Sequence, residues 1–495
     1  MIVLDTILVI ANEKFLYSFQ LFPEITIIKN ISYLPSVYLK ERSLSSVNLN
    51  YRGLLFNQIK VSLYNFDITD PQTGHHNFNI PLNSLDVSKL ILKNQLSFIP
   101  ITYIEKPIIN AKFGQSKDKL FSLFEAKYKN ISLSYFENLN YERYFQTSLF
   151  LSDFGMIGVR RNEFDATGFF ANPSILPFAY ETTLVFLSAI KYKNLGFLFR
   201  GHYDVFVYDY KKDTLIIKGI KNEHFSSKFQ ILYSFEYKNL LFEVSYKRDF
   251  LSSNIIQKSL NKLYAFRDFL IFKPSFKYKN IHSFLDIEYW IDKKSYLIAP
   301  NINVNFGNFL FSITSFSRYP DYTELYYQDP ANVSNPNLKP EFYISPEISY
   351  ENNILITKIF YRYNQNLIDW VYNSDSLKYY AMNLNLIHSI GFELFSKPIY
   401  HFQFGISLFK HLFSDTLKYK YLDNTPQLKA SILNKFFSFN IFYNEKLSPK
   451  IRSIFDIHLT YKFLEFSVED LFEQSYINEW LLSKRKVYIG FKIVI

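Results

Sequence analysis

The sequence predicts an all-β membrane protein: an antiparallel transmembrane β-barrel of about 22 strands, with an N-terminal plug domain in the lumen. Three observations support this fold class. Aromatic residues make up 19% of the 495 residues, with 53 Phe and 40 Tyr. Strands of roughly ten residues alternate apolar and polar side chains, as membrane barrels do. A short Tyr-Lys-Asn segment recurs between such strands.

Composition excludes several other classes. The chain has no cysteine, which removes disulfides, zinc-thiolate sites and cysteine catalysis. Its net charge of +10 comes from Lys and Arg scattered singly, so nucleic acid is not an expected partner. There is no apolar run of about 18 residues to form a transmembrane helix. The mean hydropathy of −0.07 also favours alternating strands over such helices.

The opening residues, MIVLDTILVIANEK, have an apolar character but do not read as a signal peptide. Asp5 interrupts them and no basic region precedes them. Three explanations stay open: the signal has been removed, the true start lies upstream, or the protein is not exported.

The segment ILYSFEYKNLLFEVSY, residues 231–246, shows how the strands pair. A two-residue turn at Lys238-Asn239 sets the register. The expected cross-strand pairs are Tyr237–Leu240, Phe235–Phe242, Tyr233–Val244 and Ile231–Tyr246. That face is wholly apolar or aromatic, whereas the other face carries Ser234, Glu236, Glu243 and Ser245. We therefore expect Phe235 and Phe242 to face the bilayer near mid-membrane and Glu236 to face the lumen. A soluble β-sandwich also alternates, but its strands are shorter than these.

The tight turns give the strand count. KYKN occurs at 127–130, 191–194 and 277–280, and EYKN at 236–239. With further turn signals, tight turns are expected near residues 129, 153, 193, 238, 279, 307, 352, 397, 435 and 462. Ten turns on one rim imply eleven long loops on the other and about 22 strands. A barrel of that width needs a plug in its lumen.

The segment SRYPDYTELYYQDPANVSNPNLKPEFYISPEISY, Ser317 to Tyr350, resembles the TonB-dependent outer-membrane receptors. Their barrels carry an R-x-P-x-x-x-E-L-Y motif followed by N-P-x-L-K-P-E. The residues that match are Arg318, Pro320, Glu324, Leu325, Tyr326, Asn335, Pro336, Leu338, Lys339, Pro340 and Glu341. The turn count independently places this segment in a long outer loop.

Other segments resemble the family in the same order along the chain. DTILVIA resembles the TonB box, which pairs with TonB as an added strand, so the expected TonB contacts are Asp5, Thr6, Ile7, Leu8 and Val9. LPSV at 34–37 and NYRG at 50–53 resemble plug motifs, and VEDLFEQSY at 468–476 resembles a segment near the barrel's end. The implied domains are a TonB-box-like segment at 1–11, a plug at 12–114 and a barrel at 115–495.

The chain also departs from the family. The glycine-rich run of the plug reads LKNQLSFIPITYIEKPI at 92–108, with nearly every glycine replaced. Asn65-Phe66 stands where the family has Asp-Gly, and the last residue is Ile495 where an aromatic is usual. Because glycine permits close backbone approach, these changes affect how the plug packs and moves.

The loop DPQTGHHNFNIPL, Asp70 to Leu82, holds two of the nine histidines. In the resembling family this loop points outward at the plug apex, and the pattern is nearest to the cobalamin-type receptors. Candidate ligand contacts are therefore Thr73, His75, His76 and Phe78, with His202 on the lumen side of the wall as a weaker one. Three readings stay open: exposed loop residues, ligand contacts, or a metal or catalytic site. Adjacent side chains on extended backbone diverge, so the pair is not expected to bind one metal ion.

The resemblance implies active import of a scarce solute across the outer membrane of a Gram-negative-type bacterium. The expected cargo is a cobalamin-like corrinoid or an iron or other metal chelate, and the expected partners are TonB and outer-membrane lipid. The protein is expected to be a monomer without enzymatic activity, cofactor or resident metal. The alternative is a passive or uncoupled outer-membrane channel or binding barrel with a degenerate plug, which the lost glycines favour.

Overall fold

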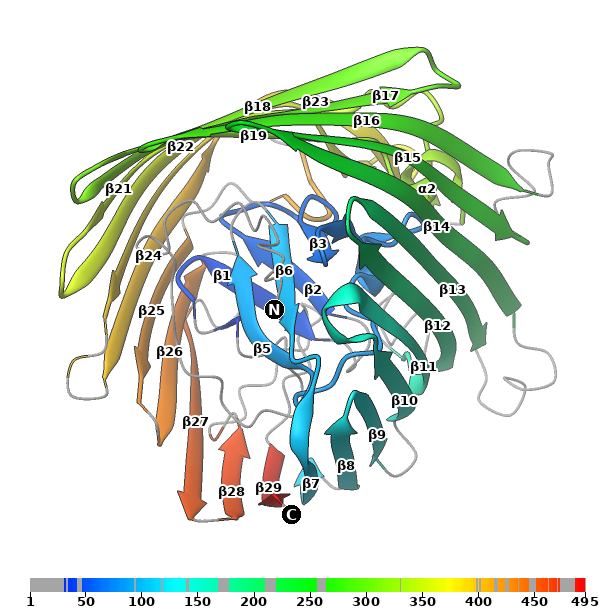
Figure 1. Cartoon of the computed structure of the whole chain (residues 1–495). Coiled ribbons are helices and arrows are strands. Elements are labelled where there is room, and N and C mark those ends of the chain that lie inside the picture. The colour runs from blue at the N-terminus through cyan, green and yellow to red at the C-terminus, as the bar shows by residue number, and fades with distance from the viewer. Residues whose placement is uncertain are drawn as a thin grey trace.

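The computed structural model shows a closed barrel wrapped around an N-terminal plug (Figure 1). It describes residues 31–494 except 33, 42–46, 93–94, 117–118, 139–141, 168–177, 210–219, 256–263, 330, 398, 400–401, 414–416, 423–426, 435, 445–450, 462, 470 and 472–485. The TonB-box-like segment lies outside the described residues. Among the described residues, no helix is long and apolar enough to cross a bilayer.

The barrel wall consists of 22 antiparallel strands, as the turn count predicted. The first eleven are β7 (Ile104–Ser116), β8 (Lys119–Lys129), β9 (Ile131–Asn138), β10 (Glu142–Phe150), β11 (Gly155–Asp165), β12 (Phe178–Tyr192), β13 (Leu195–Asp209), β14 (Ile220–Tyr237), β15 (Leu240–Ser253), β16 (Ala265–Tyr278) and β17 (Ile281–Trp290). The others are β18 (Ser295–Phe306), β19 (Phe309–Arg318), β21 (Glu341–Glu351), β22 (Leu355–Asn373), β23 (Lys378–Ser396), β24 (Gln403–Leu412), β25 (Gln427–Leu433), β26 (Phe437–Asn444), β27 (Ile451–Tyr461), β28 (Leu464–Glu469) and β29 (Lys486–Val494). β29 pairs with β7 and closes the ring.

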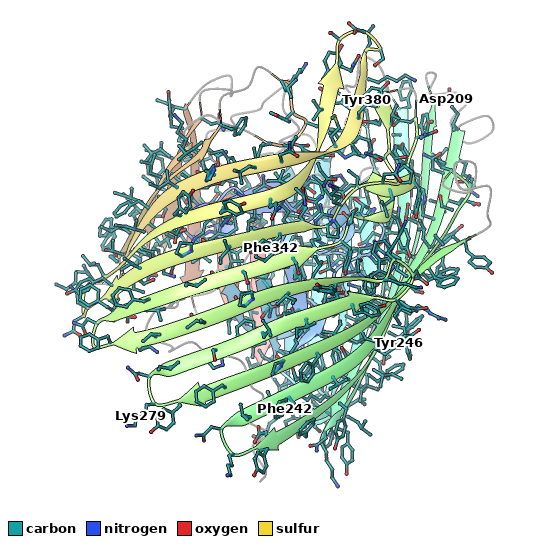
Figure 2. All side chains as sticks on the ribbon, turned by 90° about the horizontal axis from the view of Figure 1, so that it is seen from above. Asp209, Phe242, Tyr246, Lys279, Phe342 and Tyr380 are labelled. Carbon is teal, nitrogen blue, oxygen red and sulfur yellow. The ribbon has the colours of Figure 1, made fainter. Side chains whose placement is uncertain are left out.

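Antiparallel pairs lie on both sides of every expected tight turn, so all ten turn positions are confirmed. We call this end of the barrel the turn rim and the opposite end the outer rim. Figure 2 shows Lys279 at the turn rim, with Asp209 and Tyr380 at the far end of the strands. The outer connections are not all long as expected, because Ile291–Lys294 and Ser374–Leu377 are four-residue turns.

The repeated Tyr-Lys-Asn turns share one local structure. Lys129, Lys193, Lys238 and Lys279 all have a left-handed backbone, with φ of 52°, 52°, 55° and 49°. In each turn the lysine Nζ lies 5.2–5.3 Å from the ring centroid of the preceding tyrosine. The left-handed φ is an unusual conformation for lysine. The tyrosines place amphipathic rings at the level where a membrane meets water.

The register predicted for residues 231–246 is confirmed pair by pair. Phe235 and Phe242 stack on the outside of the wall with ring centroids 4.9 Å apart. They lie only three residues from the turn at Lys238-Asn239, so they sit near the turn rim and not at mid-membrane as expected. Figure 2 shows Phe242 at this end of the strands. Ile231, 45% exposed on the same face, lies nearer the middle of β14.

The plug contains two small sheets. One pairs β1 (Val37–Glu41) with β2 (Val47–Tyr51), and the other runs β4 (Phe66–Asp67), β3 (Lys60–Leu63), β6 (Gln95–Pro100), β5 (Val87–Leu92). The helix η3 (Gly74–His76) stands between β4 and β5. The apolar side chains of the plug share one buried cluster with wall residues such as Leu187, Leu198 and Leu232. The plug therefore lies inside the barrel and is packed against the wall (Figure 1).

The first wall strand starts at Ile104, so the expected domain boundary at 114/115 falls near the end of β7. The boundary was expected from recurring tight turns, and the first of these follows β8. Nothing in the local pattern of residues 104–116 reveals that this strand pairs with the far end of the chain at Lys486–Val494.

A plug apex tied to the barrel wall and to an outer loop

The loop Asp70–Leu82 folds on itself and is not extended as expected. Thr73 caps η3, with its hydroxyl accepting from the His75 N–H at 3.5 Å. The Asp70 N–H donates to Asn77 Oδ1 at 2.9 Å, which closes the loop. A Cβ on Gly74 would lie 2.8 Å from Cα of Asn57, so only glycine fits there.

The two histidines diverge even though they lie on a helical turn. His75 faces the plug: its Nδ1 lies 2.8 Å from Asn48 Oδ1, and its ring stacks on Phe56 with centroids 4.3 Å apart. Tyr421, from the connection between β24 and β25, meets the Phe56 ring edge-on at 5.1 Å. His75 is thus covered by aromatic rings and is 9% exposed.

His76 faces the barrel wall and is 3% exposed. Its ring lies 4.6 Å from the ring of His202 on β13, and its Nε2 lies 3.4 Å from Glu181 Oε1 on β12. His202 Nδ1 in turn lies 2.7 Å from Asp70 Oδ2. The structure therefore brings together His76, a candidate from the loop, and His202, the lumen-facing candidate from the wall. His75 lies apart from both.

Electrostatics at this contact follow from burial and close charges. Burial alone would raise the pKa of Asp70, but His202 and Arg200 outweigh it and hold that pKa well below its usual range. Burial, with His202 beside it, holds the pKa of His76 well below its ordinary value. Asp70 is thus ionised and His76 neutral at pH 7. Arg200 also donates to the His76 carbonyl at 2.7 Å, which fixes the loop to β13.

The other two candidate contacts lie in different surroundings. Phe78 is 5% exposed and belongs to the buried plug core. Thr73 is half-buried, whereas His75, His76 and Phe78 are buried, so Thr73 is the most accessible of the four loop candidates.

The segment between β19 and β21 covers this apex. Its helix α2 (Tyr322–Tyr326) is joined to the plug through the backbone, because the Tyr322 and Thr323 N–H groups donate to the carbonyls of Pro71 and Gln72 at 3.2 and 3.1 Å. The Thr323 hydroxyl donates to the Gln72 carbonyl as well, at 2.8 Å. The short strand β20 (Asn332–Val333) follows and pairs in parallel with β23.

The motif residues of this segment build a charge network with the plug. Arg318 donates to Glu324 and Glu341, each at 2.8 Å. The same two carboxylates accept from the plug amides of Asn57, at 2.7 Å, and Gln58, at 3.0 Å. Leu325 and Leu338 belong to a buried cluster that also contains Trp370. The motif therefore joins the outer segment, the wall and the plug.

A second anchor lies deeper, at Arg52 of the NYRG segment. Its guanidinium donates to Glu347 on β21 at 2.5 Å and to both oxygens of Glu393 on β23 at 2.8 and 2.6 Å. Sequence reasoning singled out NYRG but missed both glutamates. The sequence could have pointed to both glutamates, since each is an acidic residue on the lumen face of a wall strand.

These features define a class: a 22-strand barrel closed around a plug whose apex and flank are held by wall charges and by an outer segment. Solved structures share this fold. The siderophore receptor PirA from Acinetobacter baumannii matches with 12% identity, 96% of each chain covered and a TM-score of 0.62. The FrpB iron transporter from Neisseria meningitidis matches with 10% identity, 96% of this chain and 97% of that chain covered, and a TM-score of 0.63.

The Serratia marcescens hemophore receptor HasR, solved with its hemophore HasA and heme, matches with 11% identity, the same coverage and a TM-score of 0.63. No protein-family model and no curated protein matches the chain. At sequence identities this low, similarity to these three structures establishes the fold of the chain alone. Two of the three proteins are named as receptors and one as a transporter.

Proposed function

We propose that this protein is an outer-membrane receptor that imports a scarce solute in a TonB-dependent way. The observation that carries the proposal is the plug itself: it lies inside the barrel and is held by buried ion pairs to the wall and by backbone hydrogen bonds to α2. A solute that crosses the barrel would have to displace this plug, and the contacts make that displacement costly. The outward apolar and aromatic side chains of the wall support a place in the outer membrane.

The proposed cargo is a chelate too large and too dilute for simple diffusion. Iron-siderophore complexes and heme are supported by what the similar structures are named for, and a cobalamin-like corrinoid by the resemblance of the Asp70–Leu82 loop. Thr73, His75, His76 and Phe78 remain the proposed contacts on the plug side. Purification of the protein with bound ligand, followed by mass spectrometry, identifies the cargo class.

The coupling step is tested at Leu8. TonB pairs with its box as an added strand, and proline removes the backbone N–H that such pairing needs. Leu8→Pro is therefore expected to abolish uptake of the identified cargo and leave its binding to whole cells unchanged. Val3→Pro, which lies before the expected TonB contacts at residues 5–9, serves as the matched control and should import normally.

The alternative, a passive or uncoupled barrel, predicts a different pattern. Uptake would then continue in Leu8→Pro cells and in cells lacking the inner-membrane energising complex. The lost glycines at 92–108 motivate this alternative, because they bear on how the plug rearranges.

A further inference from the structure

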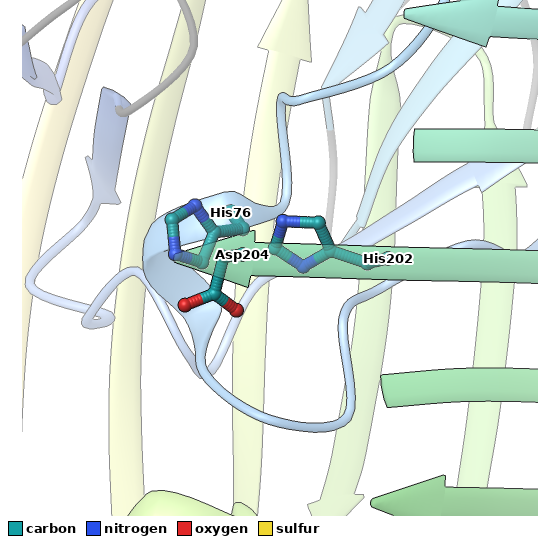
Figure 3. A group of neighbouring side chains, drawn as sticks. All are labelled: His76, His202 and Asp204. Atoms are coloured by element: carbon teal, nitrogen blue, oxygen red, sulfur yellow. The ribbon is translucent and has the colours of Figure 1, made fainter. Parts of the chain in front are cut away.

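Three buried side chains at the contact between plug and wall have the composition of a metal site. His76 comes from η3 of the plug, and His202 and Asp204 come from β13 of the wall (Figure 3). Because residues i and i+2 of a strand share a face, His202 and Asp204 point to the same side of the wall. One ligand atom from each of the three lies within 4.8 Å of the others, and all three residues are buried.

Each of the three carries a buried polar atom without a hydrogen-bond partner among the described residues. These atoms are His76 Nδ1, both ring nitrogens of His202 and Asp204 Oδ1. Such orphaned atoms are uncommon in folded proteins and call for an explanation. Two imidazole nitrogens and a carboxylate oxygen are also donors that divalent transition metals accept.

The surroundings orient these donors. Asp70 Oδ2 lies 2.7 Å from His202 Nδ1, so Nε2 is the ring nitrogen of His202 that has no carboxylate beside it in this pair. Carboxylate support of this kind is the usual second partner of a metal-bound histidine. Glu181 Oε1 lies 3.4 Å from His76 Nε2. The other ring nitrogen of His76, Nδ1, is therefore the one that a metal ion could bind. The two histidines are thus supported by different carboxylates.

The surroundings of Asp204 also suit a cation. Asp70 and Asp204 are each at most 2% exposed. Arg200 Nη2 lies 3.4 Å from Asp70 Oδ2 and compensates that carboxylate. A buried carboxylate is costly without a positive partner, and a divalent ion beside Asp204 would provide one.

We propose that His76, His202 and Asp204 bind one divalent transition-metal ion of the Zn²⁺ type between the plug apex and the barrel wall. Metal–ligand bonds of about 2.0–2.2 Å require donor atoms to approach to about 3–3.5 Å, so the side chains close in by small rotations. The mixed nitrogen and oxygen donors disfavour Ca²⁺ and Mg²⁺, which prefer oxygen ligands. The ion would join plug and wall whether or not the plug moves, so this site does not depend on the proposed import.

The test uses the full chain in detergent, purified without a histidine tag and dialysed against a chelator. Zn²⁺ is titrated by calorimetry, and Co²⁺ by its visible absorption, which reports nitrogen and oxygen ligands. One ion per chain is expected. Asp204→Asn and His202→Gln, which keep the side-chain size, should weaken binding at least about 100-fold. His388→Gln, at a wall histidine bonded to Tyr361 and remote from β13, is the matched control and should bind normally.

A thermal measurement separates loss of the site from loss of the fold. Zn²⁺ should raise the unfolding temperature of the wild type and of His388→Gln but not that of Asp204→Asn. If Asp204→Asn does not fold, His76→Gln replaces it. The proposal is overturned if the wild type binds no Zn²⁺ or Co²⁺ with stoichiometry near one. It is equally overturned if the site variants bind as the wild type does.

Discussion

At the residue scale, the plug is held by a few charged side chains buried in the lumen. Arg52 is 8% exposed and contacts Glu347 and Glu393 from two different wall strands. A buried ion pair adds little stability compared with a well-packed apolar pair, but removal of one partner is expensive because the other charge stays buried. Arg52 therefore anchors the plug to the two wall strands that carry Glu347 and Glu393.

Arg52→Met should therefore lower the free energy of unfolding by about 3–5 kcal/mol, because two carboxylates remain in the lumen without their guanidinium. The measurement is reversible urea unfolding in lipid vesicles. Arg143→Met is the control: Arg143 pairs with Glu163 but its side chain is 60% exposed, and its loss should cost less than about 1 kcal/mol. Equal costs for the two variants would show that the Arg52 contacts do not anchor the plug.

At the element scale, the hairpin of β14 and β15 shows how depth in the membrane follows from register. Ile231, Phe235 and Phe242 all point outward, but the two phenylalanines flank the tight turn while Ile231 lies farther along the strand. The cost of a charge on the lipid face depends on depth, being greatest at the bilayer midplane and small near the interface.

Ile231→Arg should cost about 2–4 kcal/mol, and Phe242→Arg a smaller amount, near 0–1 kcal/mol for the charge itself. Glu236→Arg, beside the turn and already charged, should be close to neutral. Unfolding and refolding of the three variants in vesicles gives the comparison. A greater loss for Phe242→Arg than for Ile231→Arg would contradict the depth that we assign to this hairpin.

At the scale of the whole molecule, ion pairs between plug and wall make its stability depend on pH. Burial alone would raise the pKa of Asp67, but Lys228, with Lys60 and Lys247 farther off, lowers it well below its ordinary value. Lys228 Nζ lies 2.9 Å from Asp67 Oδ2. A carboxyl whose pKa is lower in the folded than in the unfolded chain stabilises the fold above the unfolded value, about 3.9, and loses that effect as pH falls below it.

Asp67→Asn should then reduce stability by about 1–3 kcal/mol at pH 7, because Lys228 loses its charged partner. The difference between wild type and variant should shrink as pH is lowered from about 5 towards 3, because Asp67 of the unfolded chain becomes protonated there while the folded carboxylate stays ionised. Unfolding free energies measured for both proteins across this range test the prediction. A difference that stays constant with pH would mean that the Asp67 charge does not contribute.

Much of the barrel was determined by the sequence itself. The alternation of side chains along each strand and the spacing of the Tyr-Lys-Asn turns involve residues next to one another in the chain. They predicted the 22 strands, the ten turns and the register of β14 with β15. The lumen-facing side of His202 followed from the same alternation. Such features are local, because the geometry of a strand has a period of two residues.

The tertiary structure alone decided how the plug meets the wall. Arg52 and Glu393 are 341 positions apart, and Arg200 and the His76 carbonyl are 124 apart. No spacing within one sequence reveals such a contact, since it depends on where the plug comes to rest inside a closed ring. The same reason explains why His76 joins His202 and Asp204 while its neighbour His75 turns to Asn48 and Phe56: the folding of the loop, not its sequence pattern, sets the two directions.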